Sequence, residues 1–208
     1  MAPAESEPEP LADEIALKRY ASQNGLLLMG PGAGTAILNG VALGFANVLP
    51  PGPVGIVSAA GTGLQEVSTL LAKKGVGITQ GIGTGGRDLH EEVGGMMMLA
   101  GLKALQDDPA TEVIVIVSKP PAPSVAKKVL EQVALCDKPS VICFLGAKSA
   151  PSAGLAAHTL EEAAYLAVDL VRTGQRSAKA AIPQPDPRAA GLAQYLPPGQ
   201  RCLRGLFS

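Results

Sequence analysis

Two basic side chains on predicted loops are the candidates for anion chemistry. Arg87 follows a glycine-rich run, and Lys119 precedes two prolines. Arginine can hold a phosphate or carboxylate through two parallel hydrogen bonds, whereas lysine supplies a point charge. We therefore predict that Arg87 and Lys119 are the catalytic residues, which clamp a small anionic substrate and stabilise its charge during group transfer. The alternative is that each is a solvated side chain at the end of a strand.

Small residues and backbone amides surround these cations. Exposed N–H groups in glycine loops and at helix starts bind phosphate readily. The residues 61–63 are compatible with such a contact, and equally with a tight turn in which a threonine caps a helix. The run 83–86 is denser in glycine than a turn needs, which favours close approach of a ligand to the backbone. The predicted anion-binding residues are Gly61, Thr62, Gly63, Gly83, Thr84, Gly85, Gly86 and Ser118.

Other common chemistries find no support. Walker A, GxSxG, HExxH and CxxC patterns are absent from the sequence. His90 and His158 fall at predicted helix starts, so we interpret them as caps or surface residues. Wide spacing of the cysteines indicates reduced thiols and no metal site; they are Cys136, Cys143 and Cys202. We predict no bound metal and no covalently bound cofactor.

Composition narrows the class of protein. The 17 Lys and Arg nearly balance the 18 Asp and Glu, so no basic field for nucleic acid is expected. Hydrophobic residues make up 47% and charged residues 17% of the chain, which excludes wholesale disorder. No apolar run approaches the roughly 20 residues of a membrane helix, and the acidic, Pro-rich start is unlike a signal peptide. We expect a cytoplasmic protein that binds neither nucleic acid nor membranes.

The elements that must position these residues alternate along the chain. Apolar runs at 54–58, 76–81, 113–117 and 141–145 predict strands, and amphipathic segments at 64–73, 88–106, 124–135 and 159–172 predict helices. This alternation indicates an α/β fold with a parallel sheet covered on both faces. The loops after parallel strands meet at one edge of the sheet, where helix N-termini also point. Lys148 is a third cation on that edge.

Turn and cap signals refine the boundaries. Asn24 and Gly25 end a predicted helix at 13–22, residues 26–29 predict a short strand, and Asn39-Gly40 indicates a β-hairpin. Prolines at 50–53 mark a boundary to the next section. Three capping boxes are predicted; they are Thr62 with Gln65, Asp88 with Glu91, and Thr159 with Glu162.

Several phrases resemble known families. Residues 53–62 (Pro-Val-Gly-Ile-Val-Ser-Ala-Ala-Gly-Thr) resemble the start of the second α/β domain of succinyl-CoA synthetase α subunits. Residues 83–89 (Gly-Thr-Gly-Gly-Arg-Asp-Leu), 117–122 (Val-Ser-Lys-Pro-Pro-Ala) and 203–208 (Leu-Arg-Gly-Leu-Phe-Ser) resemble the FdrA family of acyl-CoA-synthetase-like proteins. The resemblance covers about residues 13–208 and corresponds to the central part of FdrA-like chains. It implies a flavodoxin-like three-layer fold.

The resemblance also implies a division of the chain. Residues 1–12 are expected to be a disordered leader, and 13–53 a remnant or edge of a CoA-binding-type domain plus the hairpin. The synthetase-like α/β domain would span 54–173. A linker at 174–200 and the start of a further strand or domain at 201–208 would follow.

The function implied is the handling of an activated acyl group. FdrA-like proteins are described as acyl-CoA synthetases and are linked to purine (allantoin) catabolism as an oxamate carbamoyltransferase subunit. Synthetase α subunits carry a phosphorylated histidine after the fourth strand and a supporting acid after the third. Here residues 146–154 contain no histidine, and Ser118-Lys119-Pro120-Pro121 replaces the acid-containing loop. We therefore expect an acyl- or carbamoyl-phosphate-handling subunit without a phosphohistidine.

Two alternatives remain open at this point. The chain is either an enzyme subunit or fragment, or a non-catalytic assembly module in which partner subunits do the chemistry. A third interpretation is a ligase-like binder of CoA or a nucleotide. In every case we expect a homo- or hetero-oligomer and an anionic ligand such as CoA, an acyl phosphate or carbamoyl phosphate.

Overall fold

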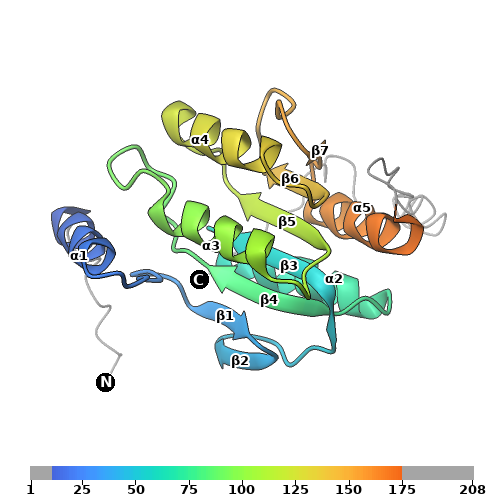
Figure 1. The fold of residues 1–208 in the computed structure, drawn as a ribbon. Helices are drawn as coiled ribbons and strands as arrows, with labels where there is room; N and C mark the ends of the chain where they lie inside the picture. The colour runs from blue at the N-terminus through green and yellow to red at the C-terminus, as the bar shows by residue number, and fades with distance from the viewer. Residues whose placement is uncertain (1–10, 175–208) are drawn as a thin grey trace, which may run out of the picture.

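A seven-stranded sheet lies at the centre of the structure, which is a computed structural model describing residues 11–174 (Figure 1). The strands are β1 (Thr35–Leu38), β2 (Val41–Gly44), β3 (Pro51–Ser58), β4 (Ile78–Gly83), β5 (Val113–Ser118), β6 (Ser140–Phe144) and β7 (Leu155–Ala156). Their order is β2-β1-β4-β3-β5-β6-β7, and β3 to β7 are parallel. Counted along the chain, these five strands follow the flavodoxin-like order 2-1-3-4-5.

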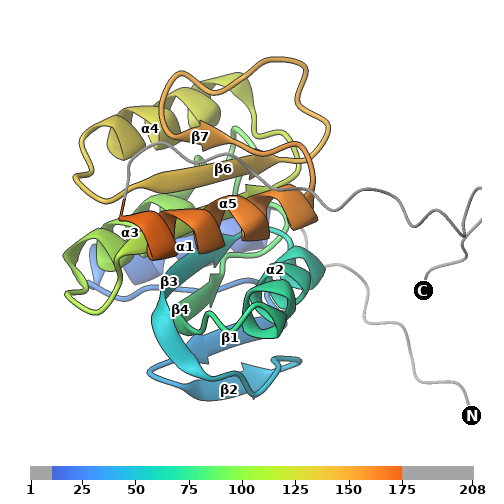
Figure 2. The ribbon, with the colours of Figure 1, turned by 90° about the vertical axis from the view of Figure 1, so that its right-hand side faces the viewer.

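Helices cover both faces of this sheet. They are α1 (Leu11–Gln23), α2 (Gly61–Lys73), α3 (Met96–Asp107), α4 (Pro123–Ala134) and α5 (Leu160–Thr173). Helices α2 and α5 pack on one face and α3 and α4 on the other, each pair over its own cluster of buried aliphatic side chains (Figure 2). Every residue of β5 is buried because helices lie on both sides of it. The predicted α/β fold with three layers is confirmed.

The predicted β-hairpin is present and extends the same sheet. Strands β1 and β2 are antiparallel and are joined by Asn39 and Gly40, with φ angles of 50° and 79°. Positive φ at both central residues is what a two-residue hairpin turn requires, and Asn-Gly tolerates it. β1 then pairs antiparallel with β4. The hairpin therefore adds an antiparallel edge to an otherwise parallel sheet.

Two of the three predicted capping boxes differ from the structure. Thr159 does cap α5, because its Oγ1 accepts a hydrogen bond from Glu162 N at 3.0 Å. α2 instead has Ala60 as its N-cap, with no side-chain cap. The predicted helix from residue 88 begins only at Met96, since Gly94 and Gly95 adopt left-handed φ angles of 76° and 75° that interrupt a helix.

The N-terminal part also departs from expectation. α1 ends at Gln23, close to the predicted stop at Asn24-Gly25. Residues 26–29 form no strand; they run as an irregular segment towards β1. The leader was predicted at 1–12, but α1 begins at Leu11, so its last two residues are helical. Residues 1–10 of the leader, the linker from residue 175 and the strand at 201–208 lie outside the described residues.

Candidate functional site

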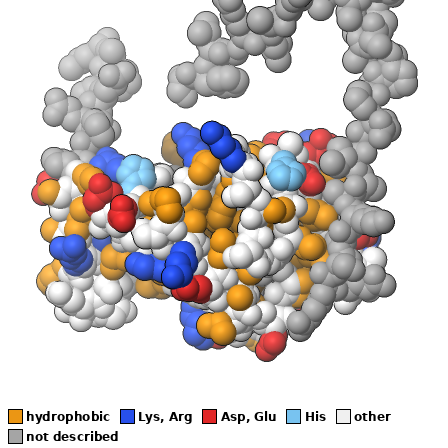
Figure 3. Space-filling model, turned by 90° about the horizontal axis from the view of Figure 1, so that it is seen from above, with side chains coloured by type: hydrophobic (Ala, Val, Ile, Leu, Met, Phe, Trp, Pro, Cys, Tyr) orange, Lys and Arg blue, Asp and Glu red, His pale blue; other side chains and the backbone are white. Residues whose placement is uncertain are grey.

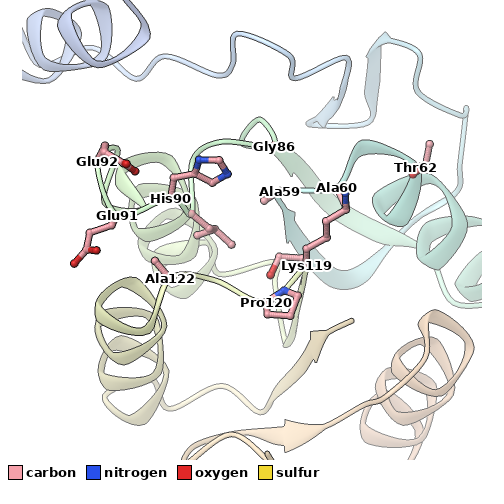
Figure 4. A pocket seen from close by; sticks show the side chains of 12 residues that line it. Ala59, Ala60, Thr62, Gly86, His90, Glu91, Glu92, Lys119, Pro120 and Ala122 are labelled. Atoms are coloured by element: carbon pink, nitrogen blue, oxygen red, sulfur yellow. The ribbon is translucent and has the colours of Figure 1, made fainter. Parts of the chain in front are cut away.

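A cavity of about 570 Å³ lies at the carboxyl ends of β3, β4 and β5. Its walls come from four places: the β3–α2 turn, the start of α2, the loop after β4 and the loop after β5 (Figure 4). This is the edge where ligands bind in open α/β sheets, beside the point at which the strand order reverses. The predicted convergence of loops on one edge therefore produces a real cavity.

The start of α2 contributes backbone amides to this cavity. Ala60 and Thr62 line it, and the first intrahelical bond runs from Leu64 N–H to Ala60 O. The N–H groups before Leu64 therefore have no carbonyl partner within the helix. The methyl side chain of Ala60, the N-cap residue, cannot accept a hydrogen bond from them. The hydroxyl of Ser58, at the end of β3, is already used by the backbone: its Oγ donates to Ala60 O at 2.7 Å and accepts from Ala60 N–H at 3.0 Å. This helix N-terminus is suited to an anion.

Ser118 supplies a second, independent feature. It ends β5, lines the cavity and is only 1% exposed, yet its Oγ has no hydrogen-bond partner. An unsatisfied buried hydroxyl costs about 1–3 kcal/mol. Native proteins rarely leave such a group unpaired without a reason. The unpaired hydroxyl marks a position where a ligand oxygen would complete the hydrogen bonding.

Lys119 stands next to this serine and is exposed. Its side chain extends across the cavity towards Ala60 at the start of α2 (Figure 4). Of the predicted site residues, the structure therefore brings four to the cavity wall: Thr62, Gly86, Ser118 and Lys119. The loop that carries Lys148 does not contribute to this wall.

Arg87 takes a different position from the one predicted. Its Nε lies 3.5 Å from Glu14 Oε2 of α1, and it is not among the residues that line the cavity. Glu14 is fully buried, and neither of its carboxylate oxygens has a hydrogen-bond partner. The arginine is thus used, at least in part, to balance a buried carboxylate.

Glu14 and Arg87 belong to a buried ionic cluster that attaches α1 to the sheet. Lys18 of α1 lies 3.4 Å from Glu14 and 3.0 Å from Asp88, and both Lys18 and Asp88 are almost wholly buried. Asp88 also accepts hydrogen bonds from the N–H groups of Met97 at 3.1 Å and Met98 at 2.8 Å. Asp88 therefore caps α3 from outside the helix, eight residues before its first residue.

Most of the predicted glycines pack against the protein itself. A Cβ at Gly83 would lie 2.3 Å from Thr35 O, and one at Gly85, whose φ is 95°, would lie 2.9 Å from Pro31 O. A Cβ at Gly63 would lie 2.9 Å from a methyl group of Val117. These positions need glycine for close packing of the chain. Gly61, Gly63, Gly83, Thr84 and Gly85 are not on the cavity wall.

The ionisable wall residues that the sequence did not predict as site residues are His90, Glu91 and Glu92. They lie on the loop between β4 and α3, where the sequence predicted the first turns of a helix. The adjacent Gly94-Gly95 pair was the available signal, because two successive glycines interrupt helices. The surface in Figure 3 shows basic, acidic and histidine side chains interspersed, so no single charge dominates that face.

The described residues offer no metal site and no reactive buried thiol. Within 11–174, no group of three or more His, Cys, Asp or Glu is arranged to hold a metal ion. Burial, and secondarily the charge of Glu162, raise the pKa of Cys143 to about 11, so this core thiol stays protonated at neutral pH. No helix in the described part of the chain is both long and apolar enough to cross a bilayer.

The segment that holds the cavity resembles a known protein family. Residues 51–146 match the model described as the CoA binding domain. This segment is similar to CoA binding domains. It overlaps the first part of the synthetase-like α/β domain predicted at 54–173, and it contains every residue of the cavity wall.

Relatives of the chain include ligase subunits. The chain is 48% identical over 198 residues to the uncharacterized protein YahF of Escherichia coli (strain K12), covering 94% of this chain and 38% of YahF. It is 30% identical over 113 residues to the succinate–CoA ligase [ADP-forming] α subunit of Methanothermobacter thermautotrophicus, covering 53% of this chain and 37% of that subunit. The chain thus spans well under half of the length of these relatives.

Solved structures share the fold at low identity. ATP citrate lyase from Methanothrix soehngenii, in complex with citrate and coenzyme A, superposes with a TM-score of 0.65 at 15% identity, covering 95% of this chain and 40% of that one. The dinucleotide-forming acetyl-coenzyme A synthetase 1 of Ca. Korarchaeum cryptofilum gives a TM-score of 0.59 at 19% identity, covering 77% and 40%. These likenesses establish the α/β architecture.

Proposed function

We propose that the cavity binds a phosphate group of coenzyme A or of an acyl-CoA, and that the chain is a CoA-binding segment of a ligase-like protein. The observation that carries this proposal is the buried, unpaired hydroxyl of Ser118 facing a cavity that the uncapped start of α2 enters. Lys119 adds a positive charge beside them. The N-terminus of a helix, a hydroxyl group and an ammonium group can together donate hydrogen bonds to the oxygen atoms of one phosphate group.

A second candidate ligand is a small acyl phosphate, including carbamoyl phosphate, as in FdrA-like proteins. The observation favouring it is Lys119 itself, which stands where the resembling synthetases have the acid that supports a phosphohistidine. A lysine there suits direct binding of a phosphorylated substrate by positioning and charge. On this proposal the chain works within a homo- or hetero-oligomer whose other parts supply the acceptor.

Calorimetric titration of the full chain tests the proposal. CoA should bind, inorganic phosphate should compete with it, and unphosphorylated adenosine should not. Lys119→Ala should weaken CoA binding about tenfold, which corresponds to about 1.4 kcal/mol for one charged contact. Lys148→Ala is the matched control, because Lys148 lies on the loop after β6 and does not line the cavity.

The outcomes separate the candidates. Tight binding of CoA with weak binding of acetyl phosphate and carbamoyl phosphate supports the CoA proposal. The reverse order supports the acyl phosphate alternative. No heat with any of these ligands, or equal loss in the two lysine variants, would contradict both and favour a non-catalytic assembly module.

A further inference from the structure

His90 occupies a defined position on the wall of the cavity. Its side chain is exposed, and the imidazole points into the cavity towards the side where Gly86 and Ala59 lie (Figure 4). The backbone around it is held on both sides: His90 N–H donates to Arg87 O at 3.0 Å, and His90 O accepts from Gly94 N–H at 2.8 Å. The imidazole is therefore presented by an ordered loop.

The same loop is attached to the wall opposite α2. Leu89 is buried, and its carbonyl accepts a hydrogen bond at 3.0 Å from the N–H of Ala122, the N-cap of α4. Ser124 Oγ donates to Glu91 Oε1 at 3.2 Å, which ties the loop to α4 a second time. These contacts fix His90 relative to the loop of Ser118 and Lys119, which leads directly into α4.

The ionisable groups around the cavity differ in how they respond to pH. Lys119 is a cation, and Glu91 and Glu92 are the acidic residues of the wall. Arg87, on the same loop as His90, is ion-paired with Glu14. Histidine is the side chain that ordinarily changes charge between about pH 5 and pH 8. A protonated His90 would add a second positive charge to the cavity, and a neutral His90 would remove it.

We propose that His90 is a pH-dependent anion contact, whose imidazolium joins Lys119 in holding a tetrahedral dianion such as a phosphate monoester. The inference rests on the proposed function, because it assigns a further residue to the same anion site. Ligand affinity then rises as the pH falls, and a rise in pH favours release. The sign follows from charge: protonation converts a neutral neighbour of the dianion into a cation.

Sulfate is the probe for the test, because it remains a tetrahedral dianion over this pH range whereas phosphate itself changes charge. Calorimetry on the full chain at constant ionic strength should give about tenfold tighter sulfate binding at about pH 5.5 than at about pH 8, as expected for one added charge. His90→Gln should abolish this difference. His158→Gln should keep it, because His158 is the chain's other histidine and lies off the wall of this cavity.

Two further measurements distinguish a loss of the imidazolium charge from a folding defect in His90→Gln. His90→Lys carries a fixed positive charge, so it should bind sulfate tightly at both pH values. Imidazole NMR signals of the wild type should show the His90 titration moving to higher pH when sulfate is added, with the His158 titration unmoved.

Each failure has a distinct meaning. A pH dependence that survives in His90→Gln would overturn this inference, because the group responsible would then be one other than His90. Equal sulfate affinity of the wild type at the two pH values would also overturn it, while leaving the anion site in place. Absence of sulfate binding at both pH values would overturn the proposed function and this inference together.

Discussion

At the scale of single residues, the most informative group is the unpaired hydroxyl of Ser118. Removing a serine hydroxyl that bonds within the protein lowers the free energy of unfolding, whereas removing a buried hydroxyl that only a ligand would bond raises it for the ligand-free protein. Because its Oγ is buried and has no partner, Ser118→Ala should raise the free energy of unfolding of the ligand-free protein by about 1 kcal/mol. The same change should weaken binding of CoA or phosphate. Urea denaturation and calorimetry measure the two effects.

The comparison residue for this prediction is Ser58, the serine that ends β3. Its Oγ is satisfied by the backbone of Ala60, so Ser58→Ala should lower stability. If Ser118→Ala also lowered the stability of the free protein, its hydroxyl would have a structural partner and the ligand interpretation would be wrong.

At the scale of elements, the start of α3 depends on a residue outside the helix. The carboxylate of Asp88 accepts hydrogen bonds from the N–H groups of Met97 and Met98 and is ion-paired with Lys18 of α1. Asp88→Asn removes the charge while keeping the size of the side chain. It should therefore lower the free energy of unfolding by about 1–3 kcal/mol, because a buried cap is weakened and the buried ammonium of Lys18 loses a counter-charge. Urea denaturation measures this change.

Asp107→Asn is the matched control at the other end of α3. Asp107 pairs with Lys103 on the surface, where both side chains are more than 60% exposed, so its loss should change stability by less than about 1 kcal/mol. Equal effects of the two substitutions would mean that the buried cluster contributes no more than a surface ion pair.

At the scale of the whole molecule, the β1–β2 hairpin and the parallel strands form one sheet. Ile37 of β1 is 3% exposed and packs in the same hydrophobic cluster as β3, β5 and α2. Ile37→Ala should therefore shift the entire unfolding transition, lowering stability by about 2–4 kcal/mol. Val41→Ala, in the same hairpin but 58% exposed, should have a much smaller effect. Circular dichroism during urea denaturation checks both variants.

The same experiment tests the division of the chain near residue 53. If Ile37→Ala produced a separate early transition and left the main one unchanged, residues 13–53 would form an independent unit. A single shifted transition would instead support one cooperative sheet from β2 to β7.

The alternation of strands and helices, the hairpin at Asn39-Gly40 and the cap at Thr159 were all predictable from the sequence. Each depends on neighbouring residues: the period of the hydrophobic pattern, the backbone preferences of Asn and Gly, or a side chain that reaches its own helix. The meeting of Ser118 and Lys119 with the start of α2 followed as well, because parallel strands deliver their loops to one edge.

Only the tertiary structure decided the positions of Arg87 and His90 and the cap of α3. Lys18 and Asp88 are 70 residues apart, and no local pattern indicates that α1 would bring buried charges to the loop after β4. That packing directs Arg87 towards Glu14 and shapes the loop that presents His90 to the cavity. Local chemistry selects elements and turns, whereas the pairing of ionic groups depends on which distant segments share one buried volume.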